Sequence, residues 1–342
     1  MPSAASRGLE RMRALAIDLP TQLRTGFSLG VELEAPVPRD VHNALAVGMG
    51  GSAAGADLAQ TLTEPETDLS LGVIRGPAIP RAVGHRTVVL VVSYSGNTWE
   101  TLSAYDAAGR QGAYRIAVSS GGELAQRAER DRVPQLQLPP GLPPRAAVGY
   151  LLGGLLGILD PFFPESNEGR LHRAVLRLAA RQPSFASPHG PPARLALAIG
   201  GREPDVYAPA EILSIARRWA AQVEENAKRP SHYGAIPEVL HNSLAAWDAT
   251  PRLRARRSAV IVLDRAAGSA PVGRSTRYLI SLLRRRGVTA RRVAFEGEDR
   301  LEAVVTGVSY GDHVSLALAQ AARQDPYDSS ALERARQALG RG

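Results

Sequence analysis

The segment from Ser214 to Leu244 contains residue types that carry out acid–base chemistry. Glu224 and Glu225 end an apolar pattern that is typical of a helix, and His241 and Asn242 follow after a proline-containing loop. A carboxylate can take a proton from carbon, and an imidazole can take and give protons near neutral pH. We therefore expect a proton-transfer site in which the acid, the base and the amide lie in one neighbourhood.

The helix that positions these glutamates is predicted to run from about 209 to 227. Its apolar residues follow the spacing of one helix face: Ile215, Ala216, Trp219, Ala220 and Val223. A carboxylate at a helix C-terminus is mildly unfavourable with the helix dipole. Simple exposure to solvent is the alternative interpretation, but this cost favours a functional reason for the glutamates.

Two loops in the first half of the sequence are suited to hold a phosphate. A buried strand leads into Gly48-Met49-Gly50-Gly51-Ser52 and then into a helix, and a β-branched strand, 88–92, leads into Ser93-Tyr94-Ser95-Gly96-Asn97-Thr98. Amides at such helix starts favour an anion, and small hydroxyls add donors. Either loop alone could be an ordinary tight turn. The pair predicts a phosphate site at the ends of adjacent strands.

Composition narrows the classes of protein that the chain can belong to. With 342 residues, 44% of them apolar, it is long enough for two globular domains, and it has no cysteine for disulfides or thiolate metal sites. The longest apolar run, 146–159, is too short to span a bilayer, and we expect a cytoplasmic protein without a membrane partner. The net charge is +8, but the basic residues are scattered except at 252–257 and 284–292. An arginine run at a helix end is more often compatible with the helix dipole than a nucleic-acid patch, so nucleic acid is not an expected partner.

The pattern of predicted elements indicates an α/β fold with parallel sheets flanked by helices. In the first half we expect a helix over 7–29, a helix over 146–159 and strands at 43–47, 69–74, 87–92, 114–118 and 134–138. In the second half we expect strands at 195–199, 259–263 and 291–295. A strand followed by Gly-Gly and a helix occurs near Ala46 and again near Ala198, which suggests two related units.

Prolines and polar residues predict the domain boundary. The expected domains are 1–165 and 193–342, joined by a linker over 166–192 that contains PSFASPHGPP. The second Gly-Gly loop lacks the hydroxyl cluster of the first. Only the first domain is therefore expected to bind phosphate.

These motifs together give the chain a resemblance to a known family. GMGGSAAG at 48–55, SYSGNTWET at 93–101, PPRAAVGYLLG at 143–153, EENAKRP at 224–230, PEVLHN at 237–242 and GDHVSLALA at 311–319 occur in the order of the bifunctional phosphoglucose/phosphomannose isomerases. The chain resembles that family over nearly its whole length. The resemblance implies two tandem sugar isomerase (SIS) domains, each with three α/β/α layers.

The resemblance also implies a role for each matching residue. Gly51, Ser52, Ser93, Ser95 and Thr98 would bind the phosphate of a phosphorylated hexose. Arg145 would stabilise an enediolate, and Glu225 would move a proton between C2 and C1. His241 would help to open the sugar ring, reaching the site from the other subunit of a homodimer. Arg336 aligns with a lysine of the family that touches the ring oxygen.

The implied chemistry agrees with what the residues can do. Moving a proton next to a carbonyl requires a carboxylate base and an electrophile for the developing oxyanion, and Glu225 with Arg145 would supply them. No metal and no cofactor are expected. The implied reaction converts glucose 6-phosphate, and mannose 6-phosphate with it, to fructose 6-phosphate.

Three departures from the family pattern leave other functions open. Arg336 replaces the family lysine, Ser243 replaces a glutamate, and Asp325-Pro326-Tyr327-Asp328 replaces a threonine-containing segment. An arginine keeps the charge but does not donate its proton at neutral pH. A sugar-phosphate-binding regulator with weak or no turnover is therefore the first alternative. Another SIS enzyme, such as a pentose- or hexulose-phosphate isomerase, is the second.

Overall fold

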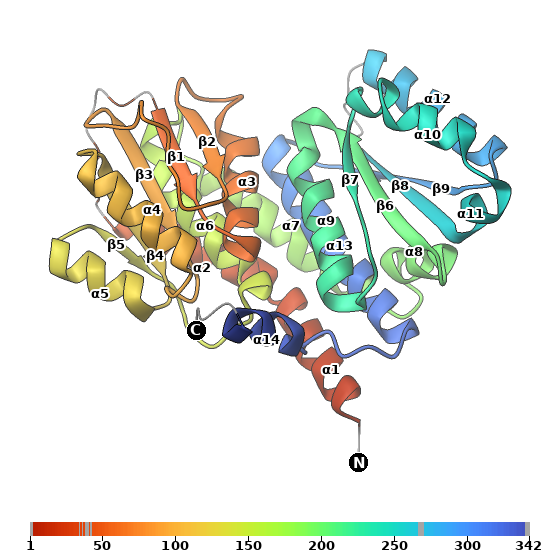
Figure 1. Cartoon of the computed structure of the whole chain (residues 1–342), viewed down its shortest axis with the longest axis horizontal. Coiled ribbons are helices and arrows are strands. Elements are labelled where there is room, and N and C mark those ends of the chain that lie inside the picture. Colours follow the sequence, from red (N-terminus) through yellow and green to blue (C-terminus); the bar gives the residue numbers. More distant parts are fainter. Residues whose placement is uncertain are drawn as a thin grey trace. The chain divides into compact units, whose positions relative to one another are not determined.

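A computed structural model of the chain describes residues 3–33, 43–265 and 270–338, with the isolated positions 35, 37 and 41; for residues 336 and 337 it describes the backbone alone. Residue contacts divide the chain into two compact units (Figure 1). The N-terminal unit comprises Asp18–Val175 with Ser330–Gly342, and the C-terminal unit comprises Met1–Ile17 with Leu176–Ser329. The first segment of the chain therefore belongs to the C-terminal unit, and the last segment belongs to the N-terminal unit.

The N-terminal unit is built on a five-stranded parallel sheet with the order β2-β1-β3-β4-β5. Its strands are β1 (Asn43–Val47), β2 (Ser70–Ile74), β3 (Thr87–Val92), β4 (Tyr114–Ser119) and β5 (Gln135–Gln137). All five lie where the sequence predicts them, within two residues at each end. Every residue of β3 is buried, as its unbroken apolar run requires.

Helices cover both faces of this sheet (Figure 1). The helices of the N-terminal unit are α2 (Leu19–Glu32), α3 (Gly50–Thr63), α4 (Trp99–Arg110), α5 (Gly122–Asp131), α6 (Val148–Leu159), the first part of α7 (Glu168–Ala186), and α14 (Ser330–Ala338). The glycine-rich α6 is buried, as predicted. A Cβ at Gly153 would lie 2.3 Å from the carbonyl oxygen of Leu23, so glycine allows α6 and α2 to pack with their backbones in contact.

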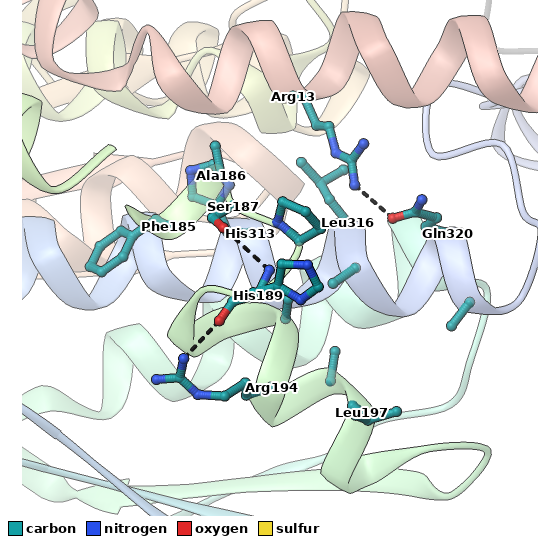
Figure 2. Close-up of a pocket in the computed structure, with 15 residues that line it drawn as sticks. Arg13, Phe185, Ala186, Ser187, His189, Arg194, Leu197, His313, Leu316 and Gln320 are labelled. Carbon is teal, nitrogen blue, oxygen red and sulfur yellow. Dashed lines mark hydrogen bonds between the residues drawn. The ribbon is translucent and has the colours of Figure 1, made fainter. Parts of the chain in front are cut away.

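The C-terminal unit is built on a four-stranded parallel sheet with the order β7-β6-β8-β9. Its strands are β6 (Glu203–Pro209), β7 (Tyr233–Ile236), β8 (Ser258–Arg265) and β9 (Thr289–Phe295). Its helices are α1 (Ala4–Ile17), α8 (Pro191–Ile199), α9 (Leu213–Ala227), α10 (Ser243–Ala249), α11 (Arg252–Arg257), α12 (Ala270–Arg285), α13 (Arg300–Ala321) and the rest of α7. Figure 2 shows a pocket that α1, α8 and α13 help to line.

The predicted fold class is confirmed, since both units are parallel α/β sheets flanked by helices. One element of the prediction is wrong. Residues 195–199 form the end of helix α8, and the strand lies further on, at Glu203–Pro209. A short apolar run does not distinguish strand from helix, but Pro191 and Pro192 are in the first turn, where proline favours a helix start. The second strand-Gly-Gly-helix unit is therefore absent, because Gly200 ends a helix.

Two further differences concern helix boundaries. The single helix expected over 7–29 is two helices, α1 and α2, separated at Asp18 just before Pro20. The segment 166–192, expected to be a linker, contains the continuous helix α7, and the division between the units falls within it. Leu171, Ala174 and Leu178 are buried along one face of α7. The burial of this apolar face stabilises the helix although prolines occur near its end.

Candidate active site

The two hydroxyl-rich loops lie where the strand order of the N-terminal sheet reverses. Loop 48–52 follows β1 and loop 93–98 follows β3, and these strands are hydrogen-bonded parallel neighbours. Strand β2, which comes between them in the sequence, lies on the far side of β1. In open parallel sheets, ligands bind at the carboxyl ends of the strands at such a switch point. The prediction that the two loops follow adjacent strands is confirmed. Ligand sites form at this carboxyl-end edge of a parallel sheet.

Direct hydrogen bonds join the residues of these loops. The amide of Tyr94 donates to Ser52 Oγ at 3.0 Å, and Ser93 Oγ donates to Thr98 Oγ1 at 3.1 Å. Ser52 and Ser93 are only 4% and 1% exposed. Since both Ser52 and Thr98 act as acceptors in these bonds, each keeps its hydroxyl proton to donate elsewhere. We name the group formed by Gly51, Ser52, Ser93 and Thr98 the hydroxyl cradle.

Two helix N-termini meet at the hydroxyl cradle, and neither has a side-chain cap. Met49 is the N-cap residue of α3; its side chain makes no capping bond, and its carbonyl oxygen accepts from the amides of Ser52 and Ala53. Thr98 is the N-cap residue of α4, but its side chain makes no capping bond. The amides at the very start of a helix favour an anion through their charge and geometry. The cradle therefore offers amides and hydroxyls, the donors that a phosphate requires.

Gly51 brings Arg145 to the cradle. A Cβ at Gly51 would lie 2.6 Å from the carbonyl oxygen of Pro144 and 2.8 Å from the amide nitrogen of Arg145. Only a glycine permits this approach, because real Cβ atoms do not come so close to backbone atoms. Arg145 itself is 5% exposed. A buried guanidinium thus lies on the chain segment that touches the start of α3.

Tyr94 is a residue of the site that the sequence analysis did not assign. Its hydroxyl donates to the carbonyl oxygen of Pro139 at 2.6 Å and accepts from the amide of Leu142 at 3.2 Å. It therefore fixes the segment that leads to Arg145. The signal was present in the sequence as one large aromatic residue among small hydroxyls. Burial raises the pKa of the Tyr94 hydroxyl, so it remains a neutral donor.

Ser95 has a different environment from the other predicted phosphate ligands. Its side chain is exposed, and its Oγ accepts from the amide of Asn97 at 3.3 Å. Gly96, with a φ of 70°, turns the loop there, and a Cβ would lie 1.8 Å from the carbonyl oxygen of Gly121. The structure brings Ser52, Ser93 and Thr98 together by hydrogen bonds, whereas Ser95 stabilises the outer side of the same turn.

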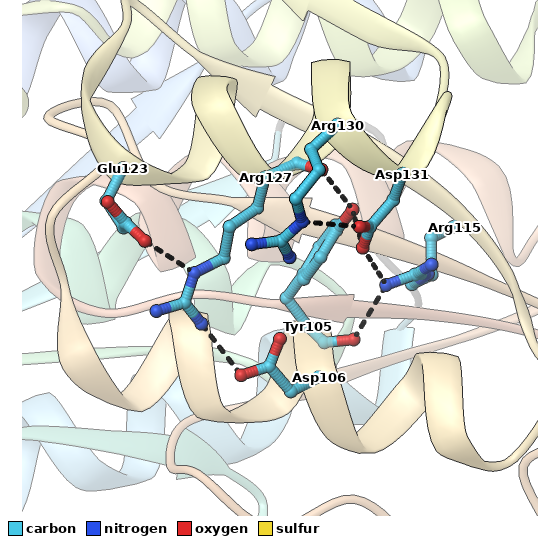
Figure 3. A network of polar contacts seen from close by, with 7 residues as sticks. All are labelled: Tyr105, Asp106, Arg115, Glu123, Arg127, Arg130 and Asp131. Atoms are coloured by element: carbon cyan, nitrogen blue, oxygen red, sulfur yellow. Dashed lines mark hydrogen bonds and ion pairs between the residues drawn. The ribbon is translucent and has the colours of Figure 1, made fainter.

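A network of ion pairs ties together the helices behind the second loop (Figure 3). Arg127 of α5 donates to Asp106 of α4 at 2.7 Å. Asp131 accepts from the hydroxyl of Tyr105 at 3.0 Å and pairs with Arg115 of β4 at 3.3 Å. Burial is the main cause that raises the pKa of Tyr105 to about 12. The network therefore holds α4, which begins at the cradle, to α5 and β4.

In the C-terminal unit, a ladder of buried polar residues orients the helix that carries Glu225. Arg218, Gln222 and Asn226 recur every four residues on α9 and face α13. Arg218 Nη2 pairs with Asp312 at 2.7 Å, Gln222 Nε2 donates to Asp312 at 2.9 Å, and Asn226 Nδ2 donates to Ser315 Oγ at 2.9 Å. We call these five residues the α9–α13 ladder. Because it fixes the rotation of α9, it also fixes the direction of the half-buried Glu225.

The ladder predicts a large stability effect. Asp312→Ala leaves the Arg218 charge, which is 2% exposed, buried without its carboxylate. Breaking a buried pair on one side costs about 3–5 kcal/mol, so we expect a loss of that size in the free energy of unfolding in denaturant titrations. The control is the double variant Arg218→Met with Asp312→Leu, which removes both charges and should lose less. A loss below about 1 kcal/mol in Asp312→Ala would contradict the ladder.

Lys228, the single lysine of the sequence, ends α9. Its Nζ donates to the carbonyl oxygens of Glu225 and Asp328, both at 2.7 Å. The ammonium therefore ties the last turn of α9 to the segment that follows α13. These contacts give Lys228 a structural role at the C-terminal end of α9.

His313 connects α13 to α7 and predicts a dependence of stability on pH. It is 4% exposed and contacts Gln182 Oε1 through Nε2 at 2.9 Å. Burial lowers its pKa from 6.5 to about 4. Between these values the unfolded chain binds more protons than the folded one, so stability falls as the pH falls from about 6.5 to about 4. At about 1.4 kcal/mol for each pKa unit, the loss from this group is about 3 kcal/mol.

The measurement compares denaturant unfolding of the wild type and His313→Leu from pH 7 to pH 4. We expect the wild type to lose about 3 kcal/mol more than the variant over this range. His172→Leu, at an exposed histidine of α7, is the matched control and should follow the wild type. Equal pH dependence in the wild type and His313→Leu would contradict the buried neutral imidazole.

Strand β7 lies between Glu225 and His241 in the sequence. Glu225 precedes β7, whereas His241 follows its end, after the short turn Glu238–Leu240. Strand β7, which was not predicted, has four residues. That the glutamate, the histidine and the amide share one neighbourhood stays a prediction.

The remaining predicted site residues are placed as follows. His241 is exposed, and Asn242 caps α10 by accepting from the amide of Ser243. Arg336 lies within α14, but its side chain is outside the described part of the structure.

No group of three or more metal-ligating side chains occurs among the described residues. None of the described helices has the length and apolar character needed to cross a membrane.

Comparison with known proteins agrees with this arrangement. Residues 189–339 match the family described as "Bacterial phospho-glucose isomerase C-terminal SIS domain". The structure of glucosamine-6-phosphate deaminase from Thermotoga maritima shares the fold, with a TM-score of 0.70 at 17% identity, covering 92% of this chain and 96% of that one. The fold and the hydroxyl cradle define a protein with the tandem SIS architecture.

Relatives in the same family identify it more closely. The chain is 30% identical to a bifunctional phosphoglucose/phosphomannose isomerase of Caldicellulosiruptor bescii, over 90% of this chain and 93% of the relative. It is 28% identical to the enzyme of the same name from Aquifex aeolicus, over 85% and 88%. The chain belongs to the bifunctional phosphoglucose/phosphomannose isomerase family, and the expected resemblance is confirmed.

Proposed function

We propose that this protein is an aldose–ketose isomerase that converts glucose 6-phosphate, and mannose 6-phosphate with it, to fructose 6-phosphate. The observation that carries the proposal is the hydroxyl cradle at the switch point, with Arg145 held against it by the close approach at Gly51. Membership in the isomerase family supports the same reaction. The substrate is therefore a phosphorylated hexose.

The N-terminal unit would bind the phosphate and stabilise the intermediate. Ser52 and Thr98 keep hydroxyl protons to donate, and the uncapped starts of α3 and α4 add amides. Ser93 holds Thr98 in position, and Ser95 would contact the phosphate from the outer side of the turn. Arg145 would stabilise the negative charge that develops on oxygen when a proton leaves C2.

The C-terminal unit would supply the base. Glu225 would remove the proton from C2 of the open-chain aldose and return it to C1, through a cis-enediolate. Glucose 6-phosphate and mannose 6-phosphate differ only in configuration at C2. Because the enediolate is planar at that carbon, it is the same species from either sugar. One carboxylate on a fixed helix is therefore sufficient for both substrates.

His241 would open the sugar ring, and it would come from the partner subunit of a homodimer. The structural support is the exposure of His241, which follows β7 in the sequence. An exposed imidazole can serve a neighbouring copy, and an imidazole takes and gives protons near neutral pH. Arg336 would keep a positive charge near the ring oxygen, without the proton-donating capacity of a lysine.

The test is a coupled assay of the purified protein with each aldose phosphate. We expect fructose 6-phosphate from glucose 6-phosphate and from mannose 6-phosphate, and no change in rate after treatment with a chelator. The alternative is a sugar-phosphate-binding regulator, which the replacements at Arg336 and Ser243 favour. Thermal stabilisation by either sugar phosphate with no detectable product would overturn the proposed enzyme and support the regulator.

A further inference from the structure

A pocket in the C-terminal unit is separate from every residue of the proposed active site. Its volume is about 360 Å³, which lies within the range of small-molecule sites. It is lined by residues of α1, α8 and α13 and of the end of α7 with the loop after it (Figure 2). Phe185 and Leu316 form apolar parts of its wall. The pocket lies wholly within one compact unit.

The titratable side chains that line this pocket are arginines and histidines. Arg13 reaches from α1 and donates to Gln320 Oε1 at 2.7 Å, and Arg194 of α8 donates to the carbonyl oxygen of His189 at 2.7 Å (Figure 2). Each of these bonds uses one of the five donors of a guanidinium. No carboxylate is among the residues that line the pocket. Its electrostatic character therefore favours an anion.

His313 adds a specific requirement. Gln182 Nε2 donates to Ser309 Oγ at 3.0 Å, so Gln182 Oε1 faces the imidazole and accepts from its Nε2 at 2.9 Å. In the neutral ring the other nitrogen, Nδ1, is then an acceptor. No hydrogen bond joins Nδ1 to any residue that the structure describes. A buried side chain that lines the pocket thus offers an acceptor, and a ligand would match it with a donor.

We propose that this pocket is a second ligand site, for a small organic anion that carries a hydroxyl group. The anionic group is held by Arg13 and Arg194, and the hydroxyl donates to His313 Nδ1. A hydroxycarboxylate and a hydroxylated phosphate ester both have this chemistry. The site does not depend on the proposed isomerase activity, because none of its residues takes part in that reaction.

The experiment is calorimetric titration of the full-length protein with two matched pairs of probes. Citrate is compared with tricarballylate, which lacks the hydroxyl, and glycerol 3-phosphate is compared with propyl phosphate. We expect at least one hydroxylated probe to bind, and its analogue to bind about fivefold more weakly, as one lost hydrogen bond implies. The pair that shows binding identifies the source of the anionic group.

Arginine variants locate the binding. Arg13→Gln and Arg194→Gln should each weaken the bound probe about tenfold, as loss of a charge-assisted bond implies. Arg274→Gln, at an exposed arginine of α12, is the matched control and should bind as the wild type does. The proposal is overturned if neither hydroxylated probe binds, if the hydroxyl makes no difference, or if neither pocket variant weakens binding.

Discussion

Glu225→Gln is expected to lose about a thousandfold or more in turnover with both aldose phosphates, because positioned acid–base groups contribute about 10²–10⁴-fold. Glutamine keeps the shape of the side chain and removes the basic oxygen. Exchange of the C2 hydrogen with solvent should disappear together with isomerisation. Binding of the phosphosugar should change little, because the proposed phosphate ligands lie on the other unit of the chain.

Glu224→Gln provides the matched control for this experiment. Glu224 is the preceding residue of α9 and is exposed, whereas Glu225 is half-buried. The same chemical change at position 224 should leave turnover and C2 exchange near the wild-type values. Solvent exchange at C2 that continues unchanged in Glu225→Gln would remove Glu225 as the base.

Two inactive variants are expected to restore activity when their subunits are mixed. If His241 acts across the interface of a homodimer, a hybrid of a Glu225→Gln chain and a His241→Ala chain contains one complete site and one site with both changes. An equal mixture after subunit exchange should reach about a quarter of the wild-type activity, because half of the dimers are hybrids and each hybrid has one working site.

The doubly substituted chain, Glu225→Gln with His241→Ala, is the control for this mixture. Mixed with the wild type, it forms hybrids in which each site carries one of the two changes, so hybrids should add no activity. Subunit exchange is verified by mass spectrometry. If hybrids have formed and the mixture of the two single variants is still as inactive as each variant alone, the prediction is contradicted. His241 would then act within its own chain or outside the reaction.

Local sequence patterns were sufficient to predict the cradle. The strands β1 and β3 are continuous apolar runs, and the glycines and hydroxyls that follow them are contiguous in the sequence. Parallel pairing then brings the two loops together, so Ser52 and Tyr94 meet although they are 42 residues apart. The helix of Glu225 was equally clear, because its apolar face repeats with helical spacing and is buried as predicted.

Features that depend on distant partners could not be predicted in the same way. Arg218 and Asp312 are 94 residues apart, and neither has a neighbour in the sequence that indicates the buried pair. Strand β7 was not predicted, because its four residues include Gly234 and have little strand character. Helix α8 was mistaken for a strand because five apolar residues satisfy both patterns, and tertiary packing decided between them.

The central proposal is that the hydroxyl cradle and Glu225 act on the same sugar phosphate. A crystal structure with 5-phosphoarabinonate, whose planar carboxylate imitates the enediolate, tests it most directly. The account predicts the phosphate at Ser52 and Thr98, and the Glu225 carboxylate within hydrogen-bonding distance of the planar end. A phosphate bound in the cradle with Glu225 directed into solvent, remote from the ligand, would contradict it.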